Sequence, residues 1–180
     1  MEIYKDIFTK EECDYIIKLI KESYQLTDFL IYDPETKGKT VLSEYSQRKG
    51  INFYDEKLAF VEERFINLAN RTESDVIYNK VRVYRFNEYN VNEYINYHGD
   101  YDAMHNEGAI ITIGLFLNDD YTGGDFCYKE DNQEHKVEQK TGTVIIFKSD
   151  VDHMITPVTS GVRYSINAWP GYKIKQTKLV

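Results

Sequence analysis

His98 and Asp100 are separated by a single residue in the stretch NYHGDYD, residues 96–102. On an extended chain, side chains at positions i and i+2 project from the same face, so this imidazole and this carboxylate can point at one ligand. The pair can hold a metal ion, or it can be an ordinary strand end that enters a polar turn. A third ligand from another part of the chain would favour the metal site.

The remaining histidines differ in their value as a third ligand. His135 lies in the charged stretch DNQEHK, which is typical of a solvated hairpin. His105 lies in a loop rich in Glu, Asn and Gly, where it would be an awkward ligand. His153 follows the apolar stretch GTVIIFK and a short acidic turn, where we expect a strand to enter the mouth of a barrel. We therefore predict that His98, Asp100 and His153 bind one metal ion.

The ligand types indicate which metal this would be. Two histidines and one carboxylate on one face leave coordination positions open, as in the non-haem Fe(II) oxygenases. A zinc site would more often use three histidines or add cysteines. Cys13 and Cys127 lie far apart in segments of different character, and we expect both to be small core residues without a disulfide. The set favours Fe(II).

A second signal comes ten residues after His153. In the segment from Gly161 to Trp169, Arg163 alternates with apolar residues, so one face of a strand carries a guanidinium. An arginine that faces into a barrel requires an anion, and a dicarboxylic co-substrate such as 2-oxoglutarate would pair with it in a bidentate manner. An arginine on the outer face would be solvated, and the alternation leaves both possibilities open.

These residues need a scaffold, and the hydrophobic pattern predicts one. Thr9-Lys10-Glu11-Glu12 is a capping box that begins one helix, and a second is expected from about Asp55 to Thr72. Residues 25–50 are predicted to form a long loop. From residue 76 the apolar period becomes two, with expected strands at 76–86, 92–98, 109–117, 124–129, 134–139, 142–148, 153–158 and 161–169. This order predicts an α+β, mainly β protein, with helices packed on one sheet of a jelly-roll or closed double-sheet barrel.

Length and charge limit the remaining possibilities. We expect residues 1–180 to form one domain, with helical support and a variable loop in 1–75 and the β-strand core in 76–170. A net charge of −8 and the lack of a basic cluster argue against a nucleic-acid partner. No apolar run is long enough for a membrane helix, and the first residues lack the form of a secretory signal, so we expect a cytoplasmic protein without a membrane partner.

An ordered set of motifs resembles one enzyme family. The segments are VRVY (81–84), HGD (98–100), TIGLFLN (112–118), TGGD (122–125), GTVIIF (142–147) and HMITPVTSGVRYSINAW (153–169). Together they resemble the 2-oxoglutarate and Fe(II)-dependent dioxygenases of the prolyl 4-hydroxylase type. The resemblance implies a double-stranded β-helix, which is a cupin-like jelly-roll, with the iron at its open end.

The resemblance also implies roles for individual residues. His98 and Asp100 match the first two iron ligands, His153 the distal histidine, and Arg163 the basic residue that pairs with the 2-oxoglutarate C5 carboxylate. Two further positions match the tyrosine of the co-substrate pocket and the strand behind that pocket: Tyr84 (with Tyr89 and Tyr94 as alternatives) and Thr112. Trp169 matches an aromatic residue near the substrate entrance and Arg48 an arginine of the variable loop, and both are expected to contact the substrate. Phe116 departs from the pattern, because the oxygen-sensing members have a tyrosine there.

The implied activity is hydroxylation of an unactivated C–H bond, with a prolyl residue of a peptide or protein as the expected substrate. O2 and 2-oxoglutarate would be consumed, succinate and CO2 would be released, and ascorbate would serve as a possible reductant. Two alternatives stay open. The substrate could be a free amino acid or another small molecule, or the chain could be a catalytically silent β-barrel binding module.

Overall fold

The computed structural model describes residues 1–28, 30–32, 40–42, 46–72, 75–100 and 110–174. His105 and part of the predicted loop at residues 25–50 lie outside these described ranges. None of the helices in the described ranges is long and apolar enough to cross a membrane.

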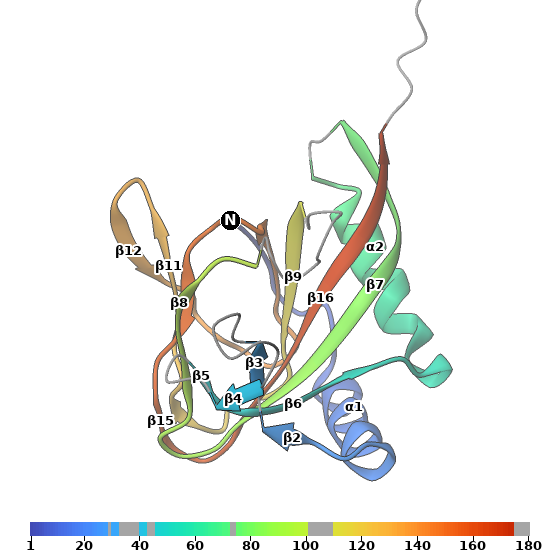
Figure 1. Ribbon diagram of the computed structural model, residues 1–180. Coiled ribbons are helices and arrows are strands. Elements are labelled where there is room, and N and C mark those ends of the chain that lie inside the picture. Colours follow the sequence, from blue (N-terminus) through green and yellow to red (C-terminus); the bar gives the residue numbers. More distant parts are fainter. Residues whose placement is uncertain (29, 33–39, 43–45, 73–74, 101–109, 175–180) are drawn as a thin grey trace, which may run out of the picture.

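Two β-sheets face each other and enclose the interior of the protein (Figure 1). The larger sheet has seven strands in the order β1-β13-β9-β16-β7-β6-β2. Their bounds, in that order, are Glu2–Tyr4, Val144–Lys148, Ile111–Phe116, Arg163–Ile174, Val76–Tyr89, Lys49–Phe53 and Thr27–Asp28. Neighbouring strands in this sheet run antiparallel, and the longest ladder joins β7 to β16.

The smaller sheet has five strands in the order β12-β11-β14-β8-β5. Their bounds, in that order, are Gln133–Lys136, Phe126–Glu130, His153–Ile155, Tyr94–His98 and Ser46–Gln47. Two short pairs complete the described strands, β10 with β15 and β3 with β4. These strands are Thr122–Gly123, Val158–Ser160, Leu30–Tyr32 and Thr40–Leu42.

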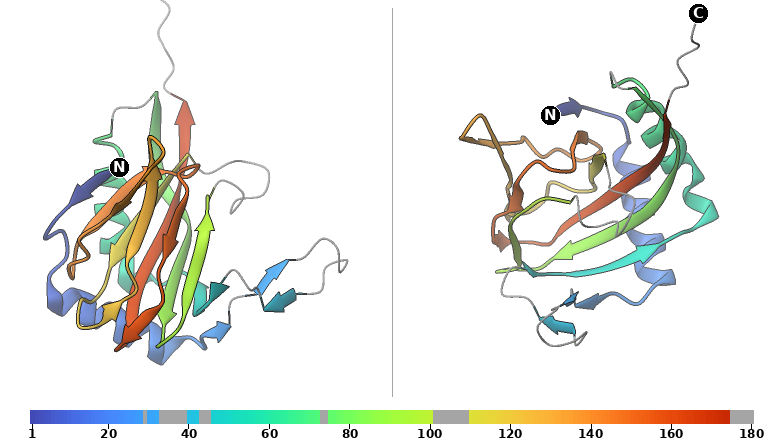
Figure 2. Two further views of the ribbon diagram at one scale, coloured as in Figure 1. Left: turned by 90° about the vertical axis from the view of Figure 1, so that its left-hand side faces the viewer. Right: turned by 45° about the horizontal axis from the view of Figure 1, so that its top comes forward.

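Two α-helices cover the outer face of the larger sheet (Figure 2). Helix α1 spans Lys10–Ser23 and begins at the predicted capping box, in which Thr9 accepts from the Glu12 backbone and Glu12 accepts from the Thr9 backbone. Helix α2 spans Ala59–Ala69 and follows the short 3-10 helix η2, Glu56–Leu58. The helices therefore support the sheet from behind and leave its other face free for the cavity.

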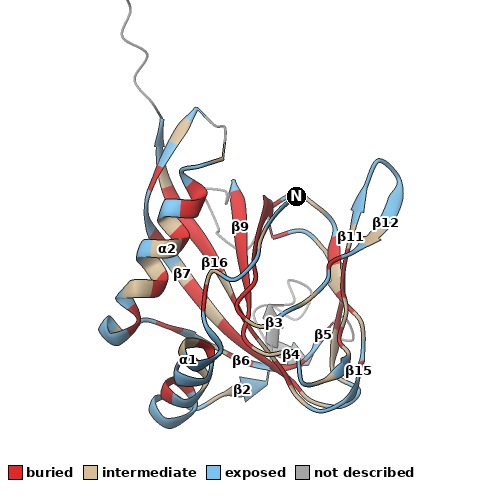
Figure 3. Ribbon diagram, turned by 180° about the vertical axis from the view of Figure 1, so that it is seen from behind, coloured by how far each residue is buried: buried red, intermediate tan, exposed pale blue. Residues whose placement is uncertain are grey.

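Side chains alternate between the two faces of β7 and β16, and this alternation separates two hydrophobic cores. Tyr84, Phe86 and Ile166 belong to the core that the helices share with the larger sheet. Tyr89 belongs to the core between the two sheets, together with residues such as Phe126. Figure 3 shows that the buried positions follow the central strands, whereas the β11–β12 hairpin is mostly exposed.

The predicted fold class, mainly β with helices packed on one sheet, is confirmed. The two sheets stay separate, so of the two expected arrangements the closed double-sheet barrel is not formed. The strand predicted at 153–158 is divided into β14 and β15, which pair with different partners. Strands also occur before residue 76, where none were predicted. β6 is one of them, and it extends the sheet beyond β7.

Candidate metal site and its cavity

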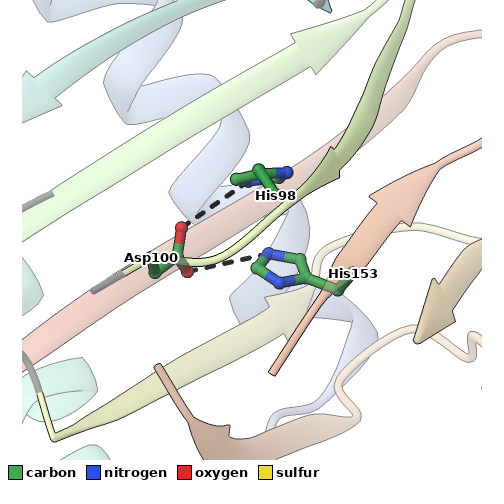
Figure 4. A group of neighbouring side chains, drawn as sticks. All are labelled: His98, Asp100 and His153. Carbon is green, nitrogen blue, oxygen red and sulfur yellow. Dashed lines mark ion pairs between the residues drawn. The ribbon is translucent and has the colours of Figure 1, made fainter. Parts of the chain in front are cut away.

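Three potential ligands converge where β8 ends beside β14. His98 and His153 are register partners on these antiparallel strands, and Asp100 follows two residues after His98. Nε2 of His98 lies 3.6 Å from Asp100 Oδ1, and Nε2 of His153 lies 3.7 Å from Asp100 Oδ2. One ligand atom from each residue lies within 4.8 Å of the others. Figure 4 shows both imidazoles turned toward the carboxylate.

Hydrogen bonds on the far side of each ring fix its orientation. Nδ1 of His98 lies 2.9 Å from the carbonyl oxygen of Asn96, and Nδ1 of His153 lies 2.9 Å from that of Val151. An imidazole that donates from Nδ1 to a carbonyl keeps the lone pair on Nε2, which is the arrangement commonly found in metal-ligating histidines. Both lone pairs are thus directed toward Asp100.

The Asp100 carboxylate is buried and held from the larger sheet. Thr112 on β9 donates its hydroxyl to Asp100 Oδ2 at 2.9 Å, and the Thr112 hydroxyl lies 3.1 Å from that of Ser149. The Asp100 backbone donates to the carbonyl of Ser149 at 2.7 Å. Thr112 was expected to stand behind the co-substrate pocket. In the structure it holds the candidate ligand Asp100.

The electrostatics of the group suit a divalent cation. Burial, and after it the neighbouring imidazole of His153, lower the pKa of His98 to about 4, so its ring is neutral at neutral pH. Within the described residues, Nε2 of His153 is buried without a hydrogen-bond partner. A buried lone pair beside a buried carboxylate is costly unless something positive lies between them. These residues therefore fit a metal ion by the chemistry of their donors.

Arg163 occupies the inner face of β16, and its side chain is buried with 2% of its surface exposed. Its Nε and Nη2 donate to the Gln139 side-chain oxygen at 3.0 and 2.9 Å, and its Nη1 donates to the Ser165 hydroxyl at 3.0 Å. Gly124, at φ +60°, gives it room, since a Cβ there would lie 3.0 Å from Arg163 Cδ. Within the described residues Arg163 forms no ion pair, so its charge is available to an anion.

One cavity between the sheets connects Arg163 with the candidate metal site. His98, His153, Arg163, Tyr89 and Arg48 all line it. The guanidinium carbon of Arg163 lies 5.1 Å from the centre of the Tyr89 ring and 5.6 Å from that of Phe116. The cavity is also lined by the apolar side chains of Phe116, Phe126, Ile145 and Phe147. A ligand with two acidic ends could therefore reach both the metal site and a buried cation.

The structure separates the tyrosines that were candidates for this pocket. Tyr84 lies on the helix side of β7, where its ring centre is 5.6 Å from that of Phe53 and 6.5 Å from that of Phe65. Tyr89 lines the cavity, whereas Tyr84 and Tyr94 are not among its lining residues. Successive side chains of a strand point to opposite faces of the sheet. Tyr84 and Tyr89 are five positions apart on β7, an odd number, so they face opposite sides.

The other predicted residues have different surroundings. Trp169 is 6% exposed and is absent from the lining of the cavity, and its indole N–H has no partner within the described ranges. His135 is stacked 5.1 Å from the Tyr128 ring on the β11–β12 hairpin and is not a member of the group formed by the three candidate ligands. Gln139 was missed by sequence reasoning. Its contact with Arg163 spans 24 positions, and no local pattern signals it.

The comparisons with known proteins agree with this site. Residues 84–171 match the family model described as the 2OG-Fe(II) oxygenase superfamily. The match covers just under half of the chain and lies within its β-strand region. The matched region includes the three candidate metal ligands, Arg163 and Tyr89.

Curated proteins that are similar to part of this chain include bacterial PKHD-type hydroxylases. One from Xylella fastidiosa is 32% identical in an alignment of 104 positions that covers 51% of this chain and 45% of the relative. One from Escherichia coli is 30% identical in an alignment of 100 positions that covers 52% of this chain and 44% of the relative. The chain thus spans less than half of the length of these relatives.

Solved structures with the same fold cover nearly the whole chain. A prolyl-4-hydroxylase from Pseudomonas putida has a TM-score of 0.68 at 15% identity, covering 94% of this chain and 90% of its own. A prolyl hydroxylase from Trichoplax adhaerens, in complex with a hypoxia inducible factor peptide fragment, has a TM-score of 0.76 at 15% identity, covering 94% and 82%. This likeness establishes the double-stranded β-helix fold.

Proposed function

We propose that this chain is an Fe(II)- and 2-oxoglutarate-dependent dioxygenase that hydroxylates a prolyl residue in a peptide or protein. The proposal rests above all on one observation: Nε2 of His98 and Nε2 of His153 both face the Asp100 carboxylate, and their Nδ1 atoms are held by backbone carbonyls. The superfamily match across residues 84–171 supports the same assignment.

In this proposal His98, Asp100 and His153 bind Fe(II), and Thr112 holds the aspartate in place through its hydroxyl group. Two imidazoles and one carboxylate leave the remaining coordination positions to other molecules. Iron with 2-oxoglutarate and O2 supplies the oxidising chemistry for C–H hydroxylation, with release of succinate and CO2 and with ascorbate as a possible reductant.

The residues around the cavity would orient the co-substrate. Arg163 binds the far carboxylate of 2-oxoglutarate, since its guanidinium is buried among neutral partners, and the hydroxyl of Tyr89 donates to the same carboxylate. The apolar wall that includes Phe126 and Phe147 keeps water from the reacting centre. The protein thereby contributes binding, orientation and exclusion of water.

A peptide or protein substrate is supported by the likeness to the Trichoplax adhaerens prolyl hydroxylase, which was solved with a peptide fragment. A free amino acid or another small molecule is the alternative. Incubating the protein with a proline-rich peptide or with free proline, followed by a mass-spectrometric search for an added oxygen, separates the two. Dependence of the product on 2-oxoglutarate links it to the proposed chemistry.

The metal ligands are tested by substitution. Asp100→Ala and His153→Ala should each reduce iron-dependent succinate production to background, because each removes one of the ligands. Matched controls are Asp152→Ala and His135→Ala, which remove an exposed aspartate and a hairpin histidine. Both should retain the activity of the unsubstituted protein. Unchanged succinate production in Asp100→Ala would refute the proposed iron site.

A further inference from the structure

Arg48 is placed where the chain passes from one sheet to the other. It is the single residue between β5, which pairs with β8 in the smaller sheet, and β6, which pairs with β7 in the larger sheet (Figure 1). Its side chain is 8% exposed and lines the cavity that also holds His98 and Arg163. The connection between β5 and β6 therefore places the guanidinium of Arg48 between the two sheets.

Arg48 makes a directed contact inside this cavity. Its Nη1 donates to the hydroxyl oxygen of Tyr89 at 2.7 Å, and both side chains are buried. A guanidinium has donors and no acceptor, so the phenol oxygen must be the acceptor in this bond. The hydroxyl proton of Tyr89 therefore points away from Arg48 and is available to another acceptor.

The same tyrosine also lies next to the cation that would hold the co-substrate. The ring centre of Tyr89 is 5.1 Å from the guanidinium carbon of Arg163 and 5.7 Å from that of Arg48. Tyr89 and Arg163 are register partners on β7 and β16, which brings the two side chains to one rung of the sheet. An anion bound by Arg163 would thus lie near the Tyr89 hydroxyl.

We propose that Arg48 is a positioning residue that fixes the Tyr89 hydroxyl as a hydrogen-bond donor to the far carboxylate of 2-oxoglutarate. This inference rests on the proposed function. It adds Arg48, which would affect co-substrate binding through Tyr89 without contacting the co-substrate itself. The resemblance alone would make Arg48 a substrate-binding residue, whereas its bond to Tyr89 assigns it to the co-substrate pocket. A hydrogen bond to a carboxylate is worth more than one between neutral groups, so its direction matters for affinity.

A pair on the opposite face of the larger sheet provides a matched control. Nζ of Lys21 donates to the hydroxyl of Tyr164 at 2.9 Å and lies 5.0 Å from the centre of its ring. This pair also joins a donor-only cation to a tyrosine, but it connects α1 with the helix side of β16. Lys21→Met and Tyr164→Phe should leave 2-oxoglutarate affinity unchanged.

The test is a double-mutant cycle on ligand affinity, measured by calorimetry with Mn(II) in place of iron so that no turnover occurs. Tyr89→Phe and Arg48→Met should each weaken 2-oxoglutarate binding by about tenfold. The double variant should be no weaker than Tyr89→Phe alone, because Arg48 acts through the hydroxyl that is already absent. Circular dichroism and thermal unfolding show whether each variant is folded.

Two further substitutions test the direction of the bond. Arg48→Lys keeps a donor-only partner and should retain most of the affinity. Arg48→Gln offers an acceptor that can capture the tyrosine proton, so it should lose affinity as Arg48→Met does. These near-conservative changes keep the proposal testable if Arg48→Met does not fold.

A second ligand separates the positioning role from a general structural one. 2-Oxopentanoate has a methyl group where 2-oxoglutarate has its far carboxylate, and the Arg48 and Tyr89 variants should bind it as well as the unsubstituted protein does. The inference would be overturned if Arg48→Met cost as much affinity in the Tyr89→Phe protein as in the unsubstituted one, or if it cost the same affinity for both ligands. If the unsubstituted protein binds no 2-oxoglutarate in the presence of Mn(II), the proposed function itself is wrong.

Discussion

At the scale of single residues, Arg163 is held by neutral side chains, Gln139 and Ser165. Gln139 accepts two hydrogen bonds from Arg163 through an amide oxygen, and its own amide nitrogen donates to the carbonyl of Gly124. A carboxylate at this position would form an ion pair with the arginine and compete with any bound anion. The amide holds the guanidinium in place and leaves its charge to the ligand.

Gln139→Glu should therefore weaken 2-oxoglutarate binding by at least about tenfold, because a buried negative charge would stand beside the anion. Gln139→Leu removes the acceptor without adding charge and should have a smaller effect. Gln133→Glu, on exposed strand β12, adds the same charge at the surface and is the control. Calorimetric titration with 2-oxoglutarate measures all three. Equal affinity in Gln139→Glu and Gln133→Glu would contradict the role of the neutral partner.

Sequence reasoning at this scale could identify residue types and spacings but not every contact. His98, Asp100 and His153 are recognisable from their types and positions, and the structure brings them together. The tyrosine is harder to assign, because choosing between Tyr84 and Tyr89 requires knowing which face of β7 carries the cavity. Gln139 has no signal, since its contact depends on how two distant strands are packed.

At the scale of elements, the capping box of α1 is the most local determinant of the fold. The Thr9 hydroxyl accepts from the Glu12 backbone at 3.2 Å, and the Glu12 carboxylate accepts from the Thr9 backbone at 2.9 Å. Glu12 also accepts two bonds of 2.7 Å from Arg64 on α2, and these bonds lower the pKa of Glu12. Glu12, in the first turn of α1, thus connects this helix to α2 through its hydrogen bonds with Arg64.

Thr9→Ala should lower the free energy of unfolding by about 1 kcal/mol, as expected for loss of an N-cap. Urea denaturation followed by circular dichroism measures the change. Lys18→Ala removes an exposed side chain from the same helix and should change stability by no more than about 0.5 kcal/mol. A Thr9→Ala protein as stable as Lys18→Ala would show that the cap contributes little.

Some helices and strands can be predicted from the sequence pattern, and others cannot. Helix α1 is predictable because its cap and its apolar spacing lie within a few residues of each other. β6 is not, since the alternation in KGINF is short and the strand is defined by its pairing with β7. The same holds for β1, three residues that pair with β13. Strands of this kind are specified by their partners rather than by their own composition.

At the scale of the whole molecule, the proposed ligands would join the two sheets. The candidate metal ligands His98 and His153 belong to the smaller sheet, whereas Arg163 and Tyr89 belong to the larger one. A metal ion together with 2-oxoglutarate would therefore tie one sheet to the other across the cavity. A ligand that binds only the folded state raises the free energy of unfolding by mass action.

Mn(II) and 2-oxoglutarate together should raise the free energy of unfolding by about 2.7 kcal/mol when 2-oxoglutarate is present at about a hundred times its dissociation constant. Chemical denaturation with and without the ligands measures the difference. The Asp100→Ala protein should show no such gain, because the metal that 2-oxoglutarate chelates would be missing. A gain of the same size in Asp100→Ala would place the ligands at another site.

The opposition of His98 and His153 on β8 and β14 has a consequence for assembly of the chain. If these strands slipped by one residue, one imidazole would turn to the opposite side of the sheet and the trio of ligands would be broken. Binding of the metal ion would therefore indicate that β8 and β14 are paired in the correct register. In a refolding mixture, the fraction of chains that retain the ion would count the molecules whose two strands had met in the right place.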